Sequence, residues 1–131
     1  MTEFLTLSCS HLCSPFPVSE RLNAFETGAL ADAASRSNLD MTHLTAAKPS
    51  VLADRAAEAG AKQIVTPFVT HGPLRDWLTL VEPHLAAQGS ALCEHRPASD
   101  EAIWPHATAG FFKVRKDISQ ILEQTIGTES L

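Results

Sequence analysis

Three groups of residues in this sequence could carry chemistry, and the first is a short polar loop. Thr70-His71-Gly72 follows an apolar stretch and precedes Pro73. Ligands of open α/β sheets bind beyond the carboxyl ends of the strands, and a helix N-terminus offers free N–H groups to anions. Thr70, His71 and Gly72 are therefore candidate ligand-binding residues. The alternative is that Thr70 only caps the helix and His71 is solvated, because one glycine makes neither a dinucleotide fingerprint nor a phosphate loop.

The second group consists of cysteines and histidines, namely Cys9, His11, Cys13, His43, Cys93 and His95. Four such side chains can close a tetrahedral zinc site, but the usual CxxC pairs are absent, and we expect no metal site. Two of them, Cys93 and His95, share one strand face. A nucleophile also needs a base within reach and a group that orients the base. No GxSxG elbow is present, so we assign no catalytic residue.

The third group is the aromatic segment 103–112, which contains Trp104, Phe111 and Phe112. Aromatic faces stack on flat ligands such as a flavin or a base, which makes Trp104 a candidate ligand-binding residue. The alternative is that the three aromatics anchor the last helix onto the sheet. Large aromatic side chains mostly serve as core residues, so we expect this segment to lock the last helix onto a βαβ core.

The elements that position these residues are clearest in residues 48–131. A helix is predicted to start at Lys48-Pro49-Ser50 and to end at Gly60. Residues 63–69 are nearly continuous in hydrophobicity, which predicts a strand buried on both faces of a parallel sheet. Pro67 lacks an N–H group and should lie near the C-terminal end of that strand.

A second helix is predicted from Gly72-Pro73, because apolar residues recur at helical spacing: Leu74, Trp77, Leu78, Val81 and Leu85. Pro83 should kink or split this helix. A short strand at 91–93 and a last helix from about Thr108 follow. Strand, helix and strand in this order predict one right-handed βαβ unit.

Residues 1–47 are weakly patterned. Residues 1–7 favour a short strand, residues 19–34 a helix with Ser19 as its N-cap, and residues 35–45 a loop. We therefore predict an α/β fold class: a small Rossmann-like domain over 48–131, with a short parallel sheet flanked by helices. The segment 1–47 precedes it and is expected to be partly disordered.

The bulk composition excludes several classes of protein. The 131 residues suit one domain, and a net charge of −5 without a basic block argues against independent binding to nucleic acid. No apolar run approaches the roughly 20 residues that cross a bilayer, and no signal peptide is recognisable. Three cysteines do not form a complete disulfide framework, which favours a reducing compartment. We expect a cytoplasmic protein that does not contact membranes.

The patterned half resembles part of a known family. The matching stretches are Ala56-Ala-Glu-Ala-Gly-Ala61, Ile64-Val-Thr-Pro-Phe68, Gly72-Pro73 and Trp104-Pro-His-Ala-Thr-Ala-Gly-Phe-Phe112. Over about residues 44–126 the chain resembles an α/β segment of bacterial, flavin-binding members of the DNA photolyase/cryptochrome family. The resemblance implies light-driven, FAD-dependent repair of pyrimidine dimers in DNA, or blue-light sensing.

The resemblance does not extend to the large helical domain in which that family holds FAD. We therefore expect a fragment or remnant that is not catalytic by itself and does not bind FAD tightly. Its partner would be a flavin-binding helical domain or a separate chain, and DNA enters only through the resemblance. Two alternatives stay open. One is a non-catalytic Rossmann-like binding or interaction module, and the other is a small hydrolase that uses His71, His95 or Cys93.

Overall fold

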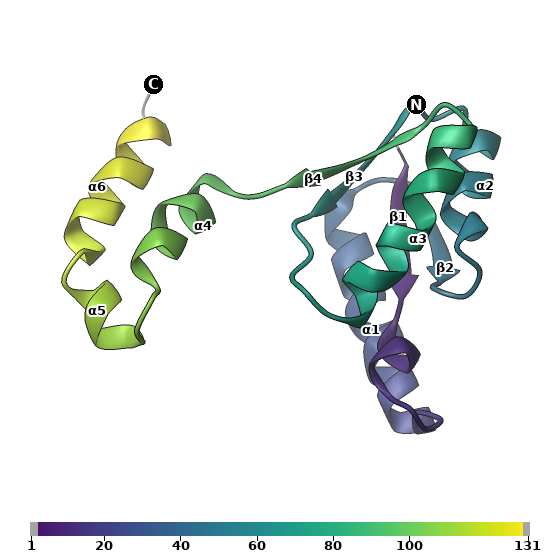
Figure 1. Cartoon of the computed structure of the whole chain (residues 1–131), viewed down its shortest axis with the longest axis horizontal. Helices are drawn as coiled ribbons and strands as arrows, with labels where there is room; N and C mark the ends of the chain where they lie inside the picture. The colour runs from purple at the N-terminus through teal and green to yellow at the C-terminus, as the bar shows by residue number, and fades with distance from the viewer. Residues whose placement is uncertain (1–2, 130–131) are drawn as a thin grey trace. The chain divides into compact units, whose positions relative to one another are not determined.

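Strands and helices alternate through the first three quarters of the chain. The computed structural model describes residues 3–129, with side chains described as far as residue 126 (Figure 1). The alternating elements are β1 (Phe4–Ser8), α1 (Glu20–Ser37), β2 (Met41–Thr45), α2 (Ser50–Glu58), β3 (Gln63–Pro67), α3 (Pro73–Ala87) and β4 (Ala91–His95). The remaining elements are the 3-10 turns η1 (Ser10–Cys13) and η2 (Trp104–His106), and the helices α4 (Ala98–Ile103), α5 (Phe111–Arg115) and α6 (Ile118–Glu129).

The chain divides into two compact units, and the boundary falls within β4. The first, here called the α/β unit, runs through Cys93. The second, the helical unit, begins at Glu94 and contains α4, α5 and α6. This division differs from the predicted one, in which residues 1–47 preceded a single domain. The α/β unit includes β1, α1 and β2, so the first 47 residues are part of the fold.

The strands form two parallel two-stranded sheets, β1 with β2 and β3 with β4. In the first sheet Phe4 lies opposite Met41 and Ser8 lies opposite Thr45, so the two strands end level with each other. Helices flank these sheets, which confirms the α/β class and the small Rossmann-like fold with short parallel sheets.

Two predictions for the first 47 residues are confirmed and one is wrong. β1 confirms a strand within residues 1–7, of which residues 1–2 lie outside the described part, and Ser19 does cap α1, since its side chain accepts a hydrogen bond from the Leu22 N–H at 3.3 Å. Residues 35–45 are not all loop, because α1 continues to Ser37 and β2 occupies the last five positions. β2 pairs with β1, whose residues lie 37 positions earlier in the chain. The strand therefore forms through a tertiary contact.

The helices α2 and α3 end in the same way, each with a glycine in the left-handed conformation. After α2, Gly60 has φ +64°, its N–H donates to Ala57, and the N–H of Ala61 donates to Ala56. After α3, Gly89 has φ +75°, and the N–H of Ser90 donates to the carbonyl of Leu85 at 2.9 Å. This pair of bonds is the Schellman motif, which satisfies the last carbonyls of a helix and turns the chain sharply. Each motif leads directly into a strand.

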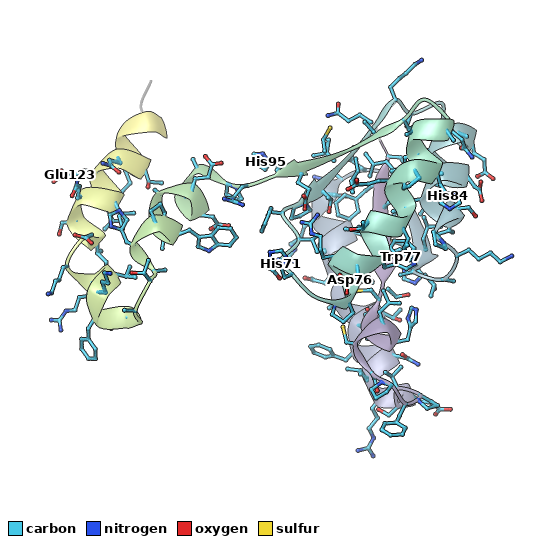
Figure 2. The ribbon with its side chains drawn as sticks, viewed as in Figure 1. His71, Asp76, Trp77, His84, His95 and Glu123 are labelled. Atoms are coloured by element: carbon cyan, nitrogen blue, oxygen red, sulfur yellow. The ribbon has the colours of Figure 1, made fainter. Side chains whose placement is uncertain are left out.

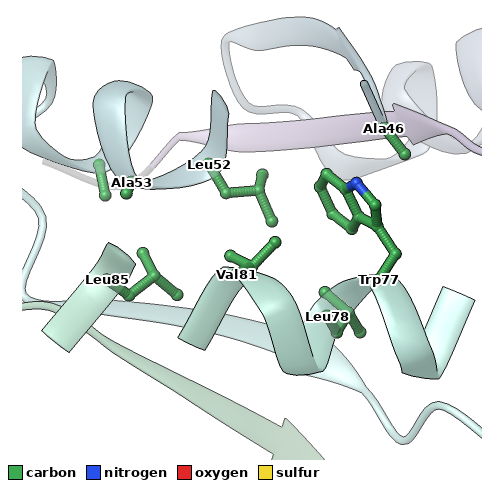
Figure 3. Close-up of a cluster of buried hydrophobic side chains, with 8 residues drawn as sticks. Ala46, Leu52, Ala53, Trp77, Leu78, Val81 and Leu85 are labelled. Atoms are coloured by element: carbon green, nitrogen blue, oxygen red, sulfur yellow. The ribbon is translucent and has the colours of Figure 1, made fainter. Parts of the chain in front are cut away.

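The hydrophobic core lies where α2 packs against α3. Its buried members are Ala46, Leu52, Ala53, Ala56, Trp77, Leu78, Val81 and Leu85 (Figure 3). The α3 members recur at helical spacing, as the sequence predicts, and the Trp77 Nε1–H donates to the carbonyl of Ala47 at 3.1 Å. The indole is thereby buried with its one polar atom satisfied.

The structure corrects the prediction for β3 and excludes one of the two outcomes predicted for Pro83 in α3. β3 is not buried on both faces, since the Val65 side chain is 65% exposed. Pro67 does end the strand, as predicted. α3 is one continuous helix through Pro83 and is not split there. Thr79, whose carbonyl loses its N–H partner to Pro83, lies on the exposed side of the helix, where water can replace the missing donor.

The aromatic segment belongs to the helical unit. Phe111 and Phe112 are 64% and 74% exposed there, and their anchoring of the last helix onto the sheet stays a prediction. The predicted helix from Thr108 is also divided. It begins only after Gly110, which has φ +76°, and is interrupted before Ile118. Glycine permits this left-handed conformation, and the chain turns there.

Candidate functional site

The carboxyl ends of β1 and β2 border a polar pocket of about 320 Å³. Its lining comes from the two strand ends, from the η1 segment and from one face of α1: Ser8, His11, Val18, Asn23, Glu26, Thr27, His43 and Thr45. Ser8 and Thr45 are register partners, so both strands deliver their last residue to the same place. Ligands of parallel α/β sheets bind at this edge.

Glu26 holds the segment that follows β1. One carboxylate oxygen accepts the N–H groups of Cys9 at 2.7 Å and Ser10 at 3.0 Å, and the other accepts the Ser10 hydroxyl at 2.6 Å. Burial alone would raise the pKa of Glu26, but these hydrogen bonds, with the nearby His11, outweigh it and hold the pKa below its usual value. The carboxylate is therefore ionised at neutral pH, and its hydrogen bonds fix the wall that carries His11.

The two histidines of the pocket each use one ring nitrogen for a hydrogen bond within the protein. The Nε2 of His11 lies 2.8 Å from the carbonyl oxygen of Ala46. A carbonyl can only accept, so Nε2 carries the proton and Nδ1 is the acceptor in the neutral ring. The Nδ1 of His43 lies 2.9 Å from the hydroxyl of the buried Thr6. Within the described part of the chain, the second nitrogen of each ring has no hydrogen-bond partner.

The hydroxyl of Ser8 is not arranged as a nucleophile. It donates to Thr45 Oγ1 at 3.1 Å and lies 3.4 Å from the carbonyl oxygen of Leu44. A catalytic serine needs a hydrogen bond to a base, and neither His11 nor His43 makes one with Ser8 among the described residues. The pocket therefore offers oriented hydrogen-bonding groups to a ligand.

The predicted ligand-binding residues lie elsewhere. Thr70 and His71 are in the loop before α3, and Gly72 has φ +148°, which favours glycine (Figure 2). Arg75 steadies this loop, since its Nε donates to the carbonyl of Val69 at 3.0 Å. Trp104 belongs to the helical unit, and the loop belongs to the α/β unit. These four residues remain predictions.

The predicted cysteine and histidine groups are only partly brought together. His11 and His43 share the polar pocket, whereas no cysteine lines it. Over residues 3–129, no group of three or more His, Cys, Asp or Glu side chains is close enough to hold a metal ion. All three cysteines are free thiols. Cys93 and His95 share β4 without a hydrogen bond between them in the described structure.

The residues in and around the candidate site do not fit the FAD that the resemblance implies. A dinucleotide needs N–H groups or cations around its pyrophosphate, whereas the polar pocket contains the ionised Glu26 and is lined by neither lysine nor arginine. The guanidinium of Arg96 lies 4.3 Å from the centre of the Trp104 ring and covers one of its faces. Phe111 and Phe112 meet edge to face, with ring centres 5.6 Å apart, and are not part of the polar pocket.

The sequence does not reveal the polar pocket as long as residues 35–45 are taken for a loop. If residues 41–45 are assigned as a strand, the rule about strand ends places Thr45 beside Ser8. His11 and His43 then become neighbours, although 32 positions separate them in the sequence. Glu26 carries no local signal, because its partners are 16 and 17 residues earlier.

Two further findings bear on function. None of the helices within the described residues is both long enough and apolar enough to traverse a membrane. Comparisons of the chain with protein-family models, with curated proteins and with solved structures each give no match.

Proposed function

We propose that the α/β unit is a binding module, and that its polar pocket takes a small uncharged molecule with several hydroxyl groups. The observation that carries this proposal is a pair of histidines in the lining, one in η1 and one in β2. Each ring is fixed through one nitrogen, which leaves His11 and His43 with one ring nitrogen each for a ligand. Side chains held by packing and hydrogen bonds lose little freedom when a ligand binds.

The charge of the pocket supports an uncharged ligand. Glu26 is ionised, which disfavours an anion, and both of its oxygens already accept hydrogen bonds, which leaves it little capacity to hold a cation. The lining also contains the amide of Asn23 and the hydroxyls of Thr27 and Thr45, which can both donate and accept hydrogen bonds. A volume of about 320 Å³ lies at the lower end of the range for small-molecule sites.

Binding is better supported than catalysis. The hydroxyl of Ser8 donates a hydrogen bond to Thr45, and the carboxylate of Glu26 accepts hydrogen bonds from the segment after β1. Neither group is therefore available as a nucleophile or as a catalytic base. The three free thiols favour a reducing, cytoplasmic setting for this module.

Ribose and adenosine are suitable probes, and the imidazole signals of the protein report on binding by NMR. Addition of millimolar probe should shift the signals of His11 and His43, and His43→Ala should weaken binding about tenfold, as for the loss of one good hydrogen bond. His84→Ala is the matched control, because His84 is exposed on α3 (Figure 2). Signal changes at His71, with none at His11 or His43, would place the site in the predicted loop and contradict the proposal.

A second candidate is that the chain is the α/β part of a photolyase-like flavoprotein, completed by a helical domain that binds flavin. The exposure of Phe111 and Phe112, within the segment that carries the resemblance, favours a partner that covers them. On this proposal the chain alone does not retain FAD. A visible spectrum of protein purified in the presence of FAD tests it, and a stoichiometric flavin band would contradict it.

A further inference from the structure

A second cavity, of about 760 Å³, lies within the α/β unit between β1 and β3. Its lining includes every residue of two stretches, 3–7 at β1 and 63–67 in β3. Successive side chains of a strand point to opposite faces, so a cavity on one face would contact only every second residue. Because every residue of both stretches lines this cavity, the cavity borders the edge of each strand. Each strand is paired on one edge only, β1 with β2 and β3 with β4, and within residues 3–129 no sheet joins β1 to β3.

The remaining walls are aliphatic side chains from all three helices of the unit. α1 contributes Leu30 and Ala33, α2 contributes Leu52, and α3 contributes Leu74 and Leu78. A volume of this size lies well within the range that holds small molecules. The cavity is open to solvent at exposed lining residues such as Val65, and an apolar molecule that enters it removes the aliphatic walls from water.

One charged side chain, Glu3, is part of the lining, and it is an ionised carboxylate that pairs with Arg55. Its carboxylate accepts hydrogen bonds from Thr42 and from Arg55, which also pairs with Glu58 at 3.1 Å. The hydrogen bond from Thr42, followed by that from Arg55, lowers the pKa of Glu3. A negatively charged ligand would meet an ionised carboxylate here, and the guanidinium of Arg55 is already engaged by two carboxylates.

The facing strand edges add polar groups to these apolar walls. Backbone N–H and C=O groups of β1 and β3 that point away from β2 and β4 have no partner strand among the described elements. A ligand that removes these backbone groups from water must give them a hydrogen-bond partner, and a neutral hydroxyl or carbonyl group on the ligand can supply one. The cavity thus combines an aliphatic interior with a few hydrogen-bonding groups along its borders.

We propose that this cavity binds an uncharged, mainly aliphatic molecule that carries a hydroxyl or carbonyl group. The site is separate from the polar pocket at the ends of β1 and β2, and Ser8, His11 and His43 do not line it. Its ligand would separate β1 from β3 and shield their facing edges.

The neutral fluorophore N-phenyl-1-naphthylamine tests this site in the full chain. Its fluorescence should rise on addition to the protein, and decan-1-ol should displace it. Decanoate has the same chain with a carboxylate and should displace it at least tenfold less well, because the charge would be buried beside Glu3. Absence of any fluorescence rise, or equal displacement by alcohol and carboxylate, would overturn the proposal.

Two substitutions on α1 locate the probe. Ala33→Trp fills the cavity and should weaken binding at least tenfold, whereas Ala29→Trp, at an exposed position of the same helix, should leave it unchanged. Thermal unfolding of each variant shows whether it is folded, and Ala33→Leu, which adds less volume, should weaken binding in the same direction. Unchanged binding in Ala33→Trp, or cross-strand nuclear Overhauser effects that show β1 paired with β3 in the free protein, would overturn the proposal.

Discussion

The hydroxyl of Ser90 donates to the carbonyl oxygen of Ala61 at 2.7 Å, and this bond joins the turn after α2 to the turn after α3. Both residues follow the glycine of their Schellman motif, with Ser90 directly before β4 and Ala61 two positions before β3. The N–H of Ala91 adds a second link, to the carbonyl of Lys62 at 3.1 Å. The ends of α2 and α3 are thereby held together next to the place where β3 and β4 pair.

Ser90→Ala should destabilise the α/β unit, because Ser90 is buried and removal of its hydroxyl leaves the Ala61 carbonyl without this hydrogen-bond donor. A buried acceptor without a partner costs about 1–3 kcal/mol. Ser35→Ala is the control, since the Ser35 hydroxyl also donates to a carbonyl but is exposed, and its removal should cost less than about 0.5 kcal/mol. Urea unfolding followed by circular dichroism measures both, and equal losses would contradict the role given to Ser90.

Glu26 should make the stability of the α/β unit depend on pH. Hydrogen bonds from Ser10 and Cys9 outweigh the effect of burial and lower its pKa in the folded state. The stabilisation is complete above the unfolded pKa of about 4.3, and it is lost as the pH falls through the lower, folded pKa. Glu26→Gln removes this contribution, so wild type and variant should differ by about 1–2 kcal/mol at neutral pH and converge in acid.

Urea unfolding near neutral pH and at about pH 3 measures this difference. Glu3 also has a lowered pKa, but it is present in both proteins and its effect cancels. Glu82→Gln, at an exposed position of α3, is the control and should match wild type at both pH values. A difference between wild type and Glu26→Gln that stays constant across the range would show that the charge of Glu26 is not what stabilises the η1 segment.

The sequence predicted those elements whose signals are local. α3 follows from the spacing of Trp77, Leu78, Val81 and Leu85, and the glycines at 60 and 89 mark the ends of two helices. The periodicity of a buried helix face and the conformational freedom of glycine are both readable within a short window. The α/β class follows from the order of these elements.

The parts that the sequence did not predict depend on contacts between distant residues. β2 exists because it pairs with β1, and Glu26 matters because α1 lies beside η1. The exposure of Phe111 and Phe112 in the segment 103–112 was not predicted either. Large aromatics usually lie in cores, but a unit that starts at Glu94 has too little chain to bury all of them, and Ile121 is the buried hydrophobic residue among its described side chains.

Two glycines should respond to alanine in opposite directions. Gly72 has φ +148°, a conformation that disfavours any side chain, and Gly72→Ala should cost about 1–3 kcal/mol. Gly28 lies inside α1, where an added methyl group would meet no other atom within 4 Å, and Gly28→Ala should stabilise by about 0.5–1 kcal/mol. Thermal unfolding of the two variants gives the signs, and a stabilising Gly72→Ala would show that the loop before α3 is not held as described.

Phe112 should contribute little to the stability of the α/β unit. Its side chain is 74% exposed in the helical unit, so Phe112→Ser removes little buried surface, and the unfolding free energy of the α/β unit should change by less than about 0.5 kcal/mol. The Leu85→Ala variant is the contrast, because Leu85 is 1% exposed in the core and its truncation should cost about 2–5 kcal/mol. The fluorescence of Trp77 during urea unfolding follows the α/β unit, provided that Trp104→Phe removes the second indole from both proteins. If Phe112→Ser destabilised that unit as strongly as Leu85→Ala, the predicted anchoring of the last helix on the sheet would be supported, and the proposal that a partner covers Phe111 and Phe112 would lose its support.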